Sequence, residues 1–277
     1  MRGLMGLIIA IATAIPVSSL PVQAEPLRFE GRVEAMRNAE LSSRLNGVIA
    51  EIAFEGGESV VAGDPLITLD PADFEIAVKV AEAELARVRA GRTLAEAESE
   101  RAERLSERGV AAEAQLQAAE AALAVATADV TAAEAALARA KLDLSRTVIR
   151  APMDGLVSRP LIAVGAFVEA EAGPPLGRIV QLDTVLVAYR VPYAVRMATM
   201  KEAGAPNLQT LFERIDLALV LPDDSTHPHR SKPRFADAAL DPETGEAIIW
   251  AEFSNPDGVL RPGMNVTVLS LIGEAAQ

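Results

Sequence analysis

Hydrophobic positions follow three successive patterns along the chain. Residues 27–69 hold short alternating runs, such as VIAEI at 48–52, that glycine and proline interrupt, a pattern typical of short strands and tight turns. The same pattern returns at Thr147 and continues towards the C-terminus, with one short helix expected near residues 193–203. Between the two lies a segment with helical spacing. The order predicts an α+β fold in which a long helical segment separates two strand-rich segments.

The first long helix is predicted to begin at Pro71. Asp70 before it is a suitable N-cap. Proline is favoured at the first helical position because a backbone N–H there would have no hydrogen-bond partner within the helix. Gly109 stands where a helix end commonly needs a left-handed residue, so we expect the helix to reach about Arg108. The 38 residues from Pro71 to Arg108 would form a rod roughly 55 Å long.

The second long helix shows the clearest periodicity, with large residues and alanines alternating at steps of three and four. This spacing is typical of a coiled-coil seam, and its alanine layers let a partner helix approach closely. Because only residues 109–112 separate the two helices, we expect them to form an antiparallel hairpin over residues 71–145. Two arms of an ordinary bundle are the alternative, but no further helix of comparable length is predicted. The seam positions are Leu116, Ala119, Leu123, Ala126, Val130, Ala133, Leu137, Ala140 and Leu144.

Charge and composition exclude several classes of chemistry. The formal net charge is −13, which argues against nucleic acid, because phosphate binding needs a basic surface. The chain has no cysteine, so it has no disulfide, thiolate metal site, cysteine nucleophile or lipidated cysteine. Its many carboxylates form no recognisable catalytic set, and we therefore expect no enzymatic activity.

One loop contains candidate metal ligands. His227 and His229 follow Asp223 and Asp224, and histidine and carboxylate are ordinary metal ligands. Their spacing is weak evidence, however, and an ordinary surface loop is favoured. We therefore expect no metal and no cofactor.

The N-terminus reads as an export signal. Arg2 precedes an apolar run at 4–15, and Val22-Gln23-Ala24 offers a small-x-small cleavage site. We expect a signal peptide over residues 1–24 and a mature chain that begins at Glu25, although the segment could instead be kept as an anchor. No later stretch is expected to be long and apolar enough to cross a membrane.

The segments on either side of the hairpin repeat one motif. In both copies ten residues separate a first glycine from the glycine of a Gly-x-x-Val unit: Gly47 from Gly57, and Gly155 from Gly165. The repeat predicts one pseudo-symmetric β domain that is assembled from both segments, with the hairpin inserted at its middle. Gly47 and Gly155 are expected to occupy equivalent tight positions in which a side chain would clash.

These segments resemble the membrane fusion protein family. NGVIAEIAFEGGESVVAGDPLITLD is similar to the first half of the family's biotinyl-lipoyl-like domain, and TVIRAPMDGLVSRPLIAVGAFVEAEAGPPLGRIV is similar to the second half. The stretch PDDSTHPHRSKPRFADAALDPETGEAIIWAEFSNPDGVLRPGMNVTVL resembles the β-barrel of HlyD-like adaptors that serve resistance-nodulation-division (RND) pumps. The resemblance covers about residues 29–269.

The resemblance implies an elongated chain of three domains. They are a β-barrel (27–40 plus 181–271), a split lipoyl-like domain (41–70 plus 146–180) and the α-helical hairpin (71–145). It also implies a periplasmic adaptor, associated with the inner membrane, that links an RND-type efflux pump to an outer-membrane channel. Several copies would form a ring-shaped conduit.

The family contacts its channel at the hairpin tip through an arginine, a leucine and a serine. Arg101 and Leu105 match the first two positions, but Ala112 stands in place of the serine. The family also usually continues past the RPGM strand into a membrane-proximal domain, which we expect to be absent or vestigial here. These two departures motivate the alternative of a periplasmic structural or regulatory scaffold with no dedicated pump.

A lipoyl-like fold also raises the possibility of a biotin or lipoyl carrier. Such a carrier presents a lysine on an exposed hairpin turn. The four lysines, Lys79, Lys141, Lys201 and Lys232, lie outside both half-motifs, and the helical hairpin occupies the place where a carrier would present its lysine. The carrier hypothesis therefore lacks its attachment residue.

Overall fold

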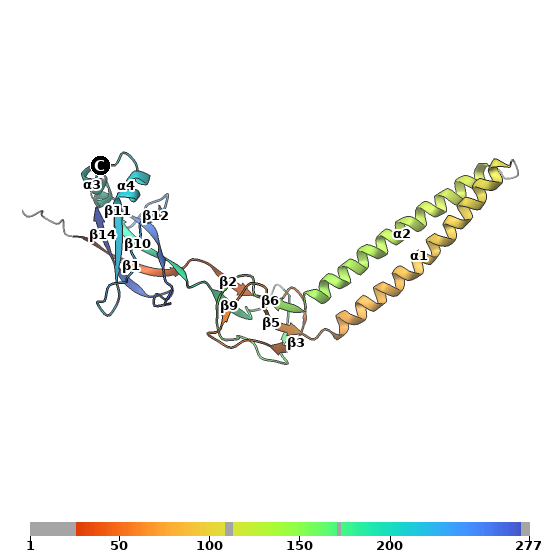
Figure 1. Cartoon of the computed structure of the whole chain (residues 1–277), viewed down its shortest axis with the longest axis horizontal. Helices are drawn as coiled ribbons and strands as arrows, with labels where there is room; N and C mark the ends of the chain where they lie inside the picture. Colours follow the sequence, from red (N-terminus) through yellow and green to blue (C-terminus); the bar gives the residue numbers. More distant parts are fainter. Residues whose placement is uncertain (1–25, 109–112, 171–172, 273–277) are drawn as a thin grey trace, which may run out of the picture. The chain divides into compact units, whose positions relative to one another are not determined.

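The computed structural model describes residues 26–108, 113–170 and 173–272 and has an α+β fold (Figure 1). The chain divides into two compact units, one of residues 1–31, 189–249 and 266–277, the other of residues 32–188 and 250–265. We describe each unit by itself. The expected export signal and Gly109 to Ala112 at the hairpin tip lie outside the described residues.

The first unit contains two short helices and parts of the strands of a six-stranded sheet. The strand order is β11-β14-β1-β10-β13-β12, and parts of β1, β10 and β13 and the first residue of β14 belong to the second unit. Alternate residues of β13 are buried, among them Ile249 and Phe253, as the period of two along a strand requires. The elements are β1 (Leu27–Ala35), β10 (Thr184–Pro192), α3 (Tyr193–Glu202), α4 (Leu208–Arg214), β11 (Ile215–Val220), β12 (Pro233–Ala236), β13 (Glu246–Ser254) and β14 (Asn265–Ile272).

Helix α3 confirms the short helix expected near residues 193–203, whereas α4 was not predicted. The N-cap of α4 is Asn207, whose side-chain oxygen accepts a hydrogen bond of 2.9 Å from the Thr210 N–H. Asparagine is a strong N-cap residue, so this local signal was available in the sequence. Seven residues are too few for a helical period to stand out.

The second unit contains two small sheets and the hairpin. The sheets have the strand orders β2-β9-β7-β4 and β6-β5-β3-β8. Their shared core includes Ile49, Leu69, Val157 and Ile179, all buried. The strands are β2 (Asn38–Leu41), β3 (Gly47–Ile52), β4 (Ser59–Val60), β5 (Pro65–Leu69), β6 (Val148–Arg150), β7 (Gly155–Val157), β8 (Phe167–Val168) and β9 (Gly177–Val180).

The two half-motifs interlock as the sequence repeat predicts. The first residue of β3, Gly47, pairs with Val168 of β8, and the first residue of β7, Gly155, pairs with Val60 of β4. In each of these two pairs, one strand therefore comes from the first half of the repeat and the other strand from the second half. The split, pseudo-symmetric β domain with its inserted hairpin is confirmed.

The residues that precede these glycines obey the same symmetry. The Asn46 side chain accepts a hydrogen bond of 2.7 Å from the Ala170 N–H, and the Asp154 side chain accepts one of 2.7 Å from the Ala62 N–H. Ala62 and Ala170 are themselves equivalent positions of the repeat. The polar residue before each first glycine thus ties one half of the domain to the other.

Helices α1 (Ala72–Glu107) and α2 (Glu113–Ser145) run side by side as a hairpin (Figure 1). All nine predicted seam positions of α2 are buried or partly buried, and every other residue from 113 to 142 is exposed. The α1 helix begins one residue later than expected, and the Asp70 carboxylate accepts a hydrogen bond of 3.0 Å from the Ala72 N–H. The nine predicted seam positions therefore lie on the buried side of α2.

Helix α2 differs from expectation in one respect. Among the described residues it is, by length and composition alone, long and apolar enough to cross a membrane. The expectation that no stretch after the N-terminal run meets this test is therefore wrong. The reason is alanine, which fills the outer surface of α2 as well as its seam.

Candidate functional site: the helical hairpin and its base

The outer half of α1 carries Arg101 and Leu105 on its exposed surface. The seam passes instead through Ser99, Ala102 and Ser106, which are partly buried. Leu105 is 38% exposed, although it is a large apolar residue. Residues four apart share a helix face, so the two side chains are presented on one side of α1. Leu105 is therefore not the last layer of the seam.

Ala112, the third residue predicted at the tip, lies outside the described residues. The structure therefore places Arg101 and Leu105 on one face of α1. That Ala112 lies close to them at the tip stays a prediction. Sequence reasoning did not include Ser99, Ala102 and Ser106 in the seam. Steps of three and four along α1, continued towards its C-terminal end, would have found them.

The register of the two helices is marked by a small buried cluster and by ion pairs. Leu85 and Val88 of α1 share the buried cluster with Val130 and Ala133 of α2. On one side of the seam the Arg89 guanidinium lies 2.7 Å from the Glu134 carboxylate, and the Lys141 ammonium lies 3.1 Å from the Glu82 carboxylate. All four side chains are about half exposed or more, so each pair contributes little stability and chiefly favours this register.

The base of the hairpin is joined to a pair of adjacent strands. The chain enters α1 from β5 and leaves α2 into β6, and β5 and β6 pair, with Thr68 opposite Val148. Beside them, the Leu69 N–H donates to the Thr147 carbonyl at 2.8 Å, and the Asp70 N–H donates to the Val48 carbonyl at 2.9 Å. Thr147 is buried, and its hydroxyl donates to the Leu144 carbonyl at 2.8 Å. The start of α1 and the end of α2 are therefore both anchored to hydrogen-bonded backbone.

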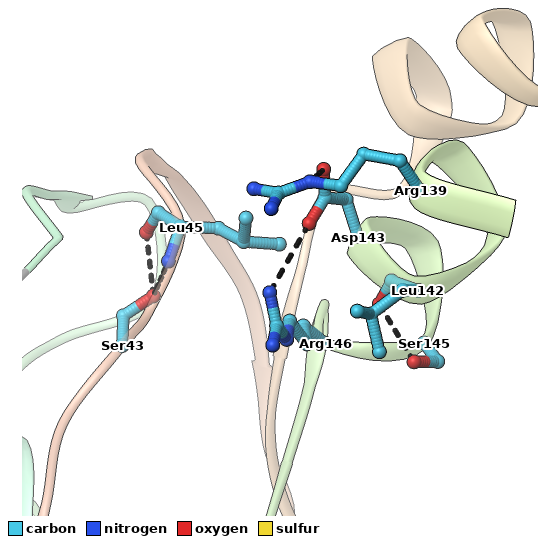
Figure 2. A network of polar contacts seen from close by, with 7 residues as sticks. All are labelled: Ser43, Leu45, Arg139, Leu142, Asp143, Ser145 and Arg146. Carbon is cyan, nitrogen blue, oxygen red and sulfur yellow. Dashed lines mark hydrogen bonds and ion pairs between the residues drawn. The ribbon is translucent and has the colours of Figure 1, made fainter. Parts of the chain in front are cut away.

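A polar network surrounds the last turn of α2 (Figure 2). The Asp143 carboxylate accepts hydrogen bonds from Arg139 Nε at 2.7 Å and from Arg146 Nη1 at 3.4 Å. A carboxylate near a helix C-terminus meets the negative end of the helix dipole, and the two guanidinium groups offset that repulsion. Sequence reasoning missed this network, although Arg139 and Asp143 stand four residues apart on the helix.

The four glycines of the repeat fall into two classes. Gly57 and Gly165 lie in turns with φ of 90° and 85°, a conformation that L side chains rarely adopt. Gly155 leaves no room for a side chain, because a Cβ there would lie 2.6 Å from the Val180 carbonyl oxygen. At Gly47, a Cβ would lie 3.5 Å from Leu69 Cδ1, which is ordinary van der Waals contact. The expectation that Gly47 is as tight as Gly155 is therefore wrong.

The loop with the two histidines has no arrangement of metal ligands. The Asp223 carboxylate accepts hydrogen bonds from the Ser225 hydroxyl at 2.6 Å and the Ser225 N–H at 3.1 Å, and these bonds lower the pKa of Asp223. His227 is buried, and its backbone N–H donates to the Leu219 carbonyl at 2.9 Å. Within the described part of the chain, no group of three or more histidines and carboxylates could hold a metal ion.

Comparison with known proteins identifies the split β domain. Residues 37–180 match the family model described as the barrel-sandwich hybrid domain of RND membrane fusion proteins, abbreviated RND MFP. The match covers more than half of the chain and includes the whole hairpin.

Curated relatives align with most of this chain. The efflux pump periplasmic linker BepF of Brucella suis is 33% identical over 260 residues, which are 92% of this chain and 62% of the relative. The solvent efflux pump periplasmic linker SrpA of Pseudomonas putida is 30% identical over 240 residues, which are 86% of this chain and 59% of the relative. The chain thus spans about three fifths of the length of these relatives.

Solved structures share the fold. A MacA–MexA chimeric protein that contains the Pseudomonas aeruginosa MexA α-hairpin domain superposes with a TM-score of 0.64 at 20% identity, over 90% of this chain and 79% of that one. MacA from Actinobacillus actinomycetemcomitans gives 0.65 at 18% identity, over 89% and 78%.

Proposed function

Because the chain belongs to the membrane fusion protein family of RND pumps, we propose that it is a periplasmic adaptor between an inner-membrane RND-type pump and an outer-membrane channel. Its role is conductive and not catalytic, and it needs no cofactor. The observation that carries this proposal is the hairpin, which projects from the split β domain and exposes Arg101 and Leu105 near its far end.

Each part of the chain has a task in this proposal. The hairpin of residues 71–145 contacts the channel through Arg101 and Leu105, with Ala112 in place of a serine at the tip. The lipoyl-like domain (41–70 plus 146–180) and the β-barrel (27–40 plus 181–271) contact neighbouring copies in a ring. Head-to-tail contacts close into a ring when the rotation between copies is right. Several tips that engage one channel together raise the effective affinity.

The partners can be tested directly. Purification of the tagged full chain from membranes, after mild crosslinking in cells, should recover an RND-type transporter and an outer-membrane channel. Recovery of the chain with neither partner, in cells that contain both, would contradict the adaptor role and favour the scaffold alternative.

Export is a second expected outcome. Arg2, the apolar run and Val22-Gln23-Ala24 predict cleavage after Ala24, so N-terminal sequencing of periplasmic protein should begin at Glu25. A membrane-bound chain that begins at Met1 would indicate an uncleaved anchor. Recovery of the full-length chain from the cytosol alone would contradict the periplasmic role.

A further inference from the structure

One asparagine of the chain is followed directly by a glycine, at Asn46-Gly47. In such a pair the backbone nitrogen of the second residue can attack the side-chain amide of the first, because a glycine has no Cβ to block the approach. Asn46 is therefore the asparagine of this chain that is most susceptible to deamidation. The others, each followed by a residue with a Cβ, are Asn38, Asn207, Asn255 and Asn265.

The fold leaves Asn46 accessible to solvent at the start of β3. Its side chain is exposed, and Gly47 after it is the first residue of the strand. Gly47 pairs with Val168 of β8, an edge strand of two residues. So short a ladder opens locally at little cost in free energy, and this opening lets the Gly47 nitrogen turn towards the Asn46 side chain. Water, which the reaction consumes, reaches the same place.

The hydrogen bond that holds the Asn46 side chain also activates it. Asn46 Oδ1 accepts this bond from the Ala170 N–H at 2.7 Å. When the Gly47 nitrogen adds to Cγ of Asn46, negative charge develops on Oδ1. A backbone N–H that already points at this atom stabilises the charge, as the donors of an oxyanion hole do. The bond to Ala170 therefore favours the reaction.

The fold does not require a glycine at position 47. The φ angle of Gly47 is not positive, and a Cβ there would meet only the Leu69 side chain, the nearest atom at 3.5 Å. At the equivalent Gly155, by contrast, a Cβ would clash with the backbone. An alanine at position 47 therefore fits the structure and at the same time hinders the attack on Asn46. The Gly47→Ala variant separates the reaction from the fold.

The second half of the repeat indicates which product the fold accepts. Asp154 occupies the position equivalent to Asn46, and its carboxylate accepts a hydrogen bond of the same length, 2.7 Å, from the Ala62 N–H. An aspartate at position 46 can accept the bond from Ala170 in the same way. An isoaspartate cannot take this place, because its main chain runs through the former side chain and is longer by one methylene group.

The extra methylene group would fall between two fixed points at the base of the hairpin. Before it, the Leu45 N–H donates to the Ser43 hydroxyl at 3.1 Å, and the Leu45 side chain packs against the core of the split β domain. After it, the Val48 carbonyl accepts the bond of 2.9 Å from the Asp70 N–H, just before α1. A longer main chain between these points displaces β3 and weakens the bond to Asp70.

We propose that Asn46 deamidates in the folded chain, and that the isoaspartate product, unlike the aspartate product, loosens the joint between the split β domain and the hairpin. The Gly47 nitrogen bonds to Cγ of Asn46 and gives up its proton, the Cγ–Nδ2 bond breaks, and ammonia leaves a succinimide. Water then opens the ring at Cγ to give aspartate, or at the backbone carbonyl of residue 46 to give isoaspartate. The reaction needs no oxidant and does not depend on the adaptor role.

Mass spectrometry of the aged full-length chain tests the reaction. Trypsin cleavage after Arg44 and Lys79 releases residues 45–79, a peptide in which Asn46 is the only side-chain amide. In mildly alkaline buffer this peptide should acquire the mass difference between amide and acid at least tenfold faster than any other asparagine is converted. The Gly47→Ala chain should react at least tenfold more slowly. The folded parent chain should react within tenfold of the rate in urea.

Two results would overturn the reaction step. If the folded chain deamidates more than tenfold more slowly than the chain in urea, the fold protects Asn46. If the parent and Gly47→Ala chains react at equal rates, the nitrogen of residue 47 is not the attacking group.

Hydrogen exchange tests the effect on the hairpin base. Chromatography separates the aspartate and isoaspartate forms of the aged chain, and an isoaspartyl methyltransferase identifies the second form. The Asp70 amide should exchange at least tenfold faster in the isoaspartate form than in the parent. The Asn46→Asp variant should match the parent, as should an aged Gly47→Ala chain, which controls for other damage. Unchanged exchange at Asp70 in the isoaspartate form, or equally fast exchange in Asn46→Asp, would overturn the proposed loosening.

Discussion

Replacement of Leu105 by aspartate is expected to abolish efflux while leaving the hairpin folded. Leu105 is exposed and lies off the seam, so its removal takes away no core contact. An apolar anchor at an interface commonly contributes about 2 kcal/mol or more, which is roughly 30-fold in affinity for each tip. Because several tips are proposed to engage one channel, the losses multiply. Efflux assays and crosslinking to the channel measure the effect.

Helical melting separates docking from packing. Leu105→Asp should melt with the parent protein, whereas Leu85→Asp, which places a charge in the buried cluster of the seam, should melt at a lower temperature. A lowered melting temperature for Leu105→Asp, with channel crosslinking intact, would make Leu105 a packing residue. Ala112→Ser should strengthen channel binding if the missing hydroxyl matters, and no change would mean that this adaptor uses a different contact.

Substitution of Gly155 by alanine is expected to destabilise the split β domain by about 1–3 kcal/mol, in the range of overpacked cores. The new Cβ would lie 2.6 Å from the Val180 carbonyl oxygen and 2.9 Å from Ile179 Cγ2, so strand β9 would have to move. Thermal denaturation of the full-length variant, followed by the loss of β structure, measures the effect.

Gly47→Ala is the matched control from the other half of the repeat. Its Cβ would meet only the Leu69 side chain, the nearest atom at 3.5 Å, so a much smaller loss of stability is expected. If the two variants lost equal stability, the conclusion that Gly155 is more tightly packed than Gly47 would be wrong. If neither changed the melting temperature, the packing of β7 on β9 would be wrong as well.

The hairpin and the repeat were predictable because both are periodic. Coiled-coil spacing places every seventh residue in the same environment, so nine seam positions could be named without knowledge of any other segment. The split β domain could be predicted from the repeat for a related reason. Two copies of one motif can be aligned with each other, and Gly57 and Gly165 occupy corresponding places in that alignment.

The sequence by itself determined that strands flank a long antiparallel hairpin, that the seam alternates large residues with alanine, and that two half-motifs build one β domain. These features depend on spacing and on local backbone preference, which a chain carries residue by residue. The family resemblance rests on the same motifs, so it was visible at the same stage.

Only the tertiary structure decided features that depend on atoms from distant segments. Gly155 is tight because the Val180 carbonyl of β9 lies against it, whereas equivalent Gly47 faces only a leucine side chain. Likewise, Leu85 and Val88 of α1 share one buried cluster with Val130 and Ala133 of α2 because side-chain packing between the helices sets their register, and no spacing within one helix records it.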